Sequence, residues 1–202
     1  MGTLTRQDRT DRALAARARV LAVAERFSRT AVEVVPRAVR HRLEALVAEA
    51  GLSEAEASAL LAAATRALER GVAAAAERLA DPDLWLEPLV LPGGGGARED
   101  GWSPLVPSWL ARLLAPRGGP DPRPGRLDDP TNRVWIALGL VARALDPVLE
   151  EFGLAPAPAP GLGGRYRLHP ESARLLDPSG RLSRLWAEYR AAYARFVEVA
   201  EG

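Results

Sequence analysis

The sequence of 202 residues contains no cysteine and no lysine. Without cysteine the chain has no disulfide, no thiol nucleophile and no thiolate ligand for zinc or an iron–sulfur cluster. Without lysine it lacks a P-loop lysine and an amine for Schiff-base chemistry, so all 27 cationic side chains are arginine. Only two histidines occur, His41 and His169, which is too few for a multi-histidine metal site within one chain. We therefore expect no metal and no cofactor.

Long hydrophobic runs are also missing. No stretch of about 18 uncharged apolar residues occurs, and the longest candidate, residues 134–141, is too short to cross a membrane. The first residues include an acid and lack the apolar centre of a signal peptide. These patterns predict a cytoplasmic protein that does not associate with membranes.

The chain is rich in alanine, leucine and arginine, which together with glutamate are strong helix formers, whereas β-branched residues are scarce. The predicted fold class is all-α, a helical bundle of about six helices with a Pro/Gly/Trp-rich irregular middle segment. We expect an N-terminal helical block at 1–83, a connecting segment at 84–129, and a C-terminal helical block at 130–202 that packs on the first.

The N-terminal block shows apolar residues at helical spacing. The spacing predicts one helix up to Val35 and a second that starts at Pro36, because proline disfavours helical geometry in the residue before it. Gly51 is the expected left-handed residue after the second helix, and Ser53 with Glu56 forms a capping box for a third. The predicted apolar positions are Leu14, Val20, Leu21, Ala24, Phe27, Ala31 and Val35 in the first helix, Val39, Leu43, Leu46, Val47 and Ala50 in the second, and Ala57, Leu61, Ala64, Leu68, Val72, Ala75 and Leu79 in the third.

The C-terminal block begins with a predicted helix at Asp129–Pro130 that bends or restarts at Asp146–Pro147 and ends at Gly153. A short extended piece is expected at 165–168, and 177–180 reads as a turn or a helix cap. The last helix has an aromatic stripe, for which we expect the helix of Trp135 as packing partner. The stripe consists of Leu182, Leu185, Trp186, Tyr189, Tyr193, Phe196 and Val197.

Three of the five tryptophans, Trp85, Trp102 and Trp109, fall in or beside the irregular middle segment. If exposed, they are candidate partner-binding residues, since tryptophan is enriched among the residues that dominate interface energies. If buried, they cover one end of the helical core. The sequence leaves both interpretations open.

Charge is distributed unevenly along the first half of the chain. Residues 1–42 hold ten arginines against four acids, and residues 43–101 hold four arginines against eleven acids. Arg12, Arg19 and Arg26 lie one heptad apart on one side of the first helix, which makes them candidate nucleic-acid-binding residues. The alternative, which the nearly cancelling charges favour, is that these arginines neutralise the acidic helix at 54–80.

No catalytic constellation or phosphate-binding loop is recognisable in the sequence. We therefore predict a non-enzymatic α-helical adaptor or assembly protein that acts through protein–protein contacts, with a protein partner or a second copy of itself. The alternative is a nucleic-acid-associated protein that uses the Arg-rich N-terminal helix, assisted by Arg112, Arg117, Arg123 and Arg126. A second alternative is an enzyme whose site has no sequence signature.

Overall fold

The computed structural model describes residues 6–86, 105–107, 123–124, 132–154, 165–167 and 174–201. The predicted all-α fold class is confirmed, because the described residues form a bundle of six helices. Their bounds are α1 (Arg6–Glu49), α2 (Glu54–Leu79), α3 (Pro82–Leu86), α5 (Asn132–Arg143), α6 (Asp146–Glu151) and α8 (Arg181–Glu201). Three short strands add a small antiparallel sheet in the order β1-β3-β2, with β1 (Leu105–Pro107), β2 (Arg123–Pro124) and β3 (Arg165–Arg167).

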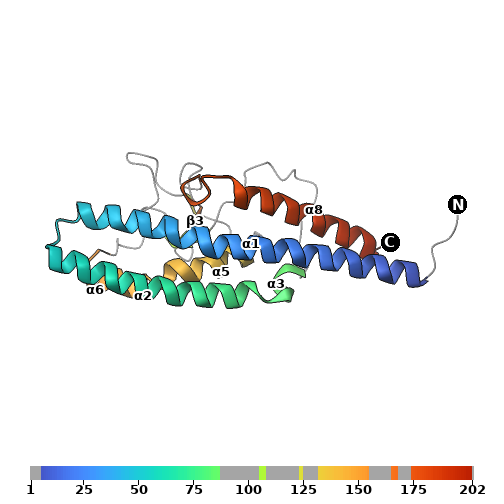
Figure 1. The fold of residues 1–202 in the computed structure, drawn as a ribbon, viewed down its shortest axis with the longest axis horizontal. Helices are drawn as coiled ribbons and strands as arrows, with labels where there is room; N and C mark the ends of the chain where they lie inside the picture. Colours follow the sequence, from blue (N-terminus) through green and yellow to red (C-terminus); the bar gives the residue numbers. More distant parts are fainter. Residues whose placement is uncertain are drawn as a thin grey trace.

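The two longest helices, α1 and α2, form an antiparallel hairpin along the length of the molecule (Figure 1). Gly51 in the turn has a φ of 65°, the left-handed conformation predicted for the residue after a helix end. Ser53 then caps α2. The Ser53 hydroxyl accepts a hydrogen bond from the backbone N–H of Glu56 at 3.3 Å, and the backbone N–H of Ser53 donates to the Glu56 carboxylate at 2.9 Å. The predicted capping box is therefore confirmed.

Helix α1 is continuous over 44 residues, so the predicted break at Pro36 is wrong. A proline inside a helix removes one backbone hydrogen bond and costs about 3 kcal/mol. The apolar stripe nevertheless crosses the proline without a change of spacing, and Val35, Val39 and Leu43 are all buried. Since each fully buried Val or Leu side chain is worth about 1.5–3 kcal/mol, packing on the other helices outweighs the cost of the proline.

The predicted core positions of α1 are mostly confirmed. Val20, Ala24, Phe27, Ala31 and Val35 are buried together. Leu14 was expected beside this stripe, but 58% of it is exposed. Helical spacing identifies an apolar side chain without showing whether another element covers it, and the buried part of α1 starts only at Val20.

Helix α2 packs most extensively on α5. Its buried residues are Leu60, Ala64, Ala67, Leu68, Gly71, Ala75 and Leu79. Ala57, Leu61 and Val72 of the predicted seam are only partly buried, whereas Leu60, Ala67 and Gly71 were not predicted. At Gly71 the two backbones meet, because a Cβ there would lie 2.8 Å from the Val141 Cα. The small residues of α2 therefore let it approach α5 closely.

The aromatic stripe of α8 packs along α1, not along α5 as predicted. Its predicted residues Leu182, Leu185, Trp186, Tyr189 and Tyr193 are buried. Asp177 caps the start of α8, as the sequence suggested. Its carboxylate accepts the N–H of Leu182 at 3.1 Å and of Ser183 at 2.9 Å. Figure 1 shows α8 lying beside the first half of α1 and antiparallel to it.

The predicted restart at Asp146–Pro147 is confirmed, since α5 ends at Arg143 and α6 begins at Asp146. Gly153 follows α6 with a φ of 68°. The predicted extended piece at 165–168 corresponds to β3. Most of the predicted connecting segment 84–129 lies outside the described residues, and the division into three parts stays a prediction.

Candidate interaction surface

Trp85, one of the three candidate tryptophans, lies in the core and is 2% exposed. Helix α3 turns it inward, its Nε1 donates to the Leu79 carbonyl at 2.8 Å, and its ring packs edge-on against Phe27 and Tyr189. The packing interpretation therefore holds for Trp85, which presents no surface to a partner. Trp102 and Trp109 lie outside the described residues, so their role as partner-binding residues stays a prediction.

Tyr189 completes the buried cluster where α1, α3 and α8 meet. Its hydroxyl donates to the Trp85 carbonyl at 2.8 Å across 104 positions of sequence. Burial raises the pKa of the Tyr189 hydroxyl, with a smaller contribution from repulsion by Tyr193. Both polar atoms of the cluster are satisfied inside the fold, so the cluster holds the helices together and has no free group for chemistry.

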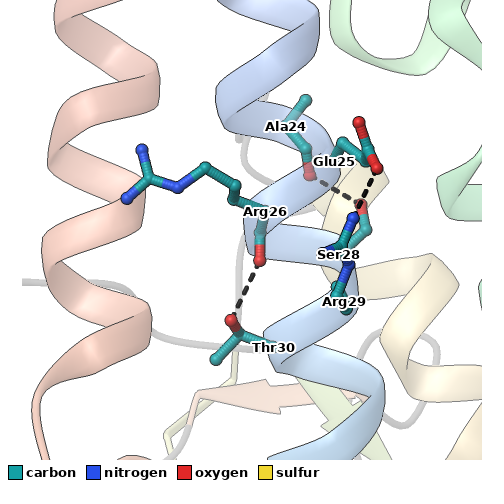
Figure 2. A network of polar contacts seen from close by, with 6 residues as sticks. All are labelled: Ala24, Glu25, Arg26, Ser28, Arg29 and Thr30. Carbon is teal, nitrogen blue, oxygen red and sulfur yellow. Dashed lines mark hydrogen bonds and ion pairs between the residues drawn. The ribbon is translucent and has the colours of Figure 1, made fainter.

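Arg26 is the one candidate arginine whose partner the structure records. Its Nη1 lies 2.9 Å from the Glu188 Oε2, and Figure 2 shows the side chain extending from α1 toward α8. The neighbouring contacts are local to α1. Arg29 forms an ion pair with Glu25, the Ser28 hydroxyl donates to the Ala24 carbonyl, and the Thr30 hydroxyl donates to the Arg26 carbonyl. The predicted pairing of this arginine with the acidic helix at 54–80 is therefore wrong. The acid that it meets is on α8.

Arg12 and Arg19 are exposed on the first turns of α1. No side chain from Gln7 to Arg19 is buried, although Ala13 and Ala16 are partly buried, and Figure 1 shows the first turns of α1 running beyond the end of α8. We call residues 6–19 the projecting end of α1. It carries the exposed Leu14 and five arginines against two aspartates, a net charge of +3.

The turn between α1 and α2 lies at the opposite end of the molecule (Figure 1). Residues 43–65, which we call the hairpin tip, contain four glutamates and no basic residue. Glu44, Glu49, Glu54 and Glu56 are all exposed. Hydrogen bonds from the Ser53 side chain and backbone lower the pKa of Glu56, so the carboxylate stays charged. The residues between the glutamates include four alanines, three larger apolar residues and Gly51 in the turn.

Catalytic chemistry finds little support in the part of the chain that the structure describes. Within it, no group of three or more His, Asp or Glu residues could hold a metal ion. His41 is exposed on α1, and His169 is outside the described residues. The buried Nε atom of Arg42 has no hydrogen-bond partner, but the residue as a whole is only partly buried.

The described helices contain none that is long and apolar enough to cross a membrane. No protein-family model matches the chain, and no curated protein or solved structure matches it either. The functional interpretation therefore depends on the residues of this chain. Sequence analysis did not identify the projecting end of α1, because spacing alone does not show where along a helix burial begins.

Proposed function

We propose that the protein is a helical adaptor or assembly protein, which binds another protein, or further copies of itself, through the projecting end of α1. The observation that carries the proposal is that this helix continues for about four turns beyond the first buried residue, Val20. Most helical stability in proteins comes from tertiary packing, so a helix end without buried side chains is marginally stable in water. A partner that covers it buries Leu14 and supplies the tertiary contacts that most helices depend on.

Side-chain chemistry supports a protein as the partner. Arginine is enriched at the centres of protein interfaces, and its flat guanidinium forms paired hydrogen bonds with carboxylates. The projecting end combines such arginines with alanines that let a second helix approach closely, and with one large apolar side chain, Leu14. An acidic helical surface is the complement that this combination fits.

A nucleic acid is the second candidate partner, and the exposure of Arg12 and Arg19 is the observation in its favour. Two features favour a protein instead. Asp8 and Asp11 interrupt the arginines on the same turns, and Phe27, the first aromatic residue of the chain, is buried in the core and cannot stack on bases.

Site-specific crosslinking tests the proposal. A photo-crosslinking amino acid replaces Leu14 in the full chain, and a matched variant carries it at Ala74, which is exposed on α2. After illumination in the source cells, we expect a covalent adduct with a protein, either a second copy or another chain, from position 14 only. Adducts of equal yield at both positions, or none at position 14, would show that the projecting end is not a binding surface.

A further inference from the structure

The small antiparallel sheet brings together residues from three segments that are far apart in the sequence. In its register Val106 and Pro124 are both opposite Tyr166, so this row across the three strands is apolar. In the next row, Arg123 on β2 is directly opposite Arg167 on β3. The pairing of the strands therefore places two arginines side by side that are 44 positions apart in the sequence.

A third arginine belongs to the same face of the sheet. Arg165 is two positions before Arg167 on β3, and residues two apart on a strand share a face. Opposite residues of antiparallel strands are about 5 Å apart and diagonal neighbours about 7–8 Å, so the three arginines are within reach of one small anion. We call Arg123, Arg165 and Arg167 the arginine face. Leu105 and Pro107, which pair with the two arginines of β3, complete this face on β1.

The apolar row belongs to the other face of the sheet, because successive residues on a strand alternate between faces. One strand, β1, packs on α5. Antiparallel sheets commonly pack their apolar face on the core and leave the polar face to solvent. This rule assigns the apolar row to the side of α5 and the arginine face to the opposite side.

The elements around the arginine face supply little negative charge. The three strands contain no aspartate or glutamate, and α5 has two arginines, Arg133 and Arg143, and no acid. Asp121 is the only acid within two positions of any of the strands, and Arg126 offsets it. Like charges directly opposite each other destabilise a pair of strands. A bound anion converts this repulsion into attraction.

We propose that the arginine face binds a phosphate group of a small phosphorylated ligand. The planar guanidinium donates paired hydrogen bonds to phosphate oxygens and stays charged at physiological pH. A compact cluster of three cations fits a small anion with more than one charge, whereas nucleic-acid binders typically present a longer basic stripe or patch. The arginine face is separate from the projecting end of α1, so this inference does not depend on the proposed function.

Isothermal titration calorimetry of the full chain with pyrophosphate as the probe tests the proposal. Arg123→Gln with Arg167→Gln removes two of the three cations. The matched control, Arg66→Gln with Arg70→Gln, removes the same charge from exposed positions of α2. We expect the wild type and the control to bind pyrophosphate alike. In the first variant the affinity should fall by about tenfold or more for each arginine removed, since hydrogen bonds from a charged donor are lost.

Thermal unfolding separates binding from a structural role of the arginines. Without pyrophosphate, the first variant should melt at the temperature of the wild type or above it, because the repulsion between Arg123 and Arg167 is gone. Excess pyrophosphate should raise the melting temperature of the wild type and of the control and leave that of the first variant nearly unchanged. A first variant that melts below the wild type without pyrophosphate would contradict the proposal, because the arginines would then stabilise the sheet by themselves.

The inference would be overturned if pyrophosphate did not bind the wild type, bound the first variant equally well, or lost the same affinity in the control. A single-stranded oligonucleotide without a terminal phosphate is the second probe. If it bound more tightly than pyrophosphate and lost its affinity in the first variant, the arginine face would be a nucleic-acid surface instead. The crosslinking experiment at Leu14 is unaffected by any of these results, so the two proposals are tested separately.

Discussion

Gly71 is a residue at which the backbones of α2 and α5 come close together. A Cβ on Gly71 would lie 2.8 Å from the Val141 Cα and 2.9 Å from the Leu140 carbonyl oxygen. Both are backbone atoms, so the neighbour can give way only if α5 moves. Gly71 was not among the apolar positions predicted for this helix, because glycine has no side chain to add to an apolar pattern.

Gly71→Ala should therefore destabilise the protein. In an open helix the same change stabilises by about 1 kcal/mol through helix propensity. Here we expect the free energy of unfolding to fall by about 1–3 kcal/mol, the usual cost of adding atoms to a packed contact. Urea unfolding measures the difference, and Ala74→Gly on the exposed face of α2 serves as a control for propensity alone. A Gly71→Ala protein more stable than the wild type would mean that α2 and α5 are farther apart than described.

Tyr189 connects α8 to the end of α3 through its hydrogen bond to the Trp85 carbonyl. Tyr189→Phe keeps the ring and removes the donor, so it should cost about 1–3 kcal/mol by leaving a buried carbonyl without its partner. Urea unfolding measures the loss. A Tyr189→Phe protein as stable as the wild type would contradict a structural role for the Tyr189 hydroxyl.

The raised pKa of Tyr189 adds a pH dependence. The folded protein holds the phenolic proton more tightly than the unfolded chain does. The stabilisation is therefore complete below the unfolded pKa of about 10 and is lost as the pH rises above it. As the pH rises above 10, the Tyr189→Phe variant should therefore lose less stability than the wild type. Urea unfolding at a series of pH values measures the difference.

At the scale of single elements, the continuity of α1 across Pro36 is the clearest difference from the sequence-based prediction. Local preference argued for a break, and the uninterrupted burial of Val35 and Val39 decided against it. The caps at Ser53 and at Asp177 were predicted correctly, because a cap depends on neighbours within a few residues. The break was predicted wrongly because it depends on distant partners.

Replacing Pro36 by alanine should stabilise the protein. Alanine restores the backbone N–H that proline lacks and removes the steric conflict with the preceding turn, a gain of up to about 3 kcal/mol less the added entropy of the unfolded chain. Differential scanning calorimetry should show a higher melting temperature. Val35→Pro, which places a proline at a buried position of the same turn, should lower it. A lower melting temperature for Pro36→Ala would indicate that the proline is required for the shape of α1.

At the scale of the whole molecule, the bundle is held by α8 on α1 and by α5 on α2, and no side chain of residues 7–15 is buried. Removal of residues 1–15 should therefore change the free energy of unfolding by less than about 1 kcal/mol, as surface changes do. Removal of residues 1–28 also takes away Val20, Val23 and Phe27, which are fully buried, and should unfold the protein. Urea unfolding followed by circular dichroism distinguishes the two. Unfolding by the short deletion would place the projecting end within the core.

The sequence by itself determined the all-α class, the caps at Ser53 and Asp177, the restart at Asp146 and the buried stripe of α8, because each follows from spacing or from contacts between near neighbours. Only the tertiary structure decided that α8 packs on α1, that Trp85 is buried, that Arg26 meets Glu188 and that Leu14 is exposed. Periodicity identifies which face of a helix is apolar. The element that packs on this face is determined by residues far away in the sequence. Tyr189 and Trp85, which are in contact, are 104 positions apart.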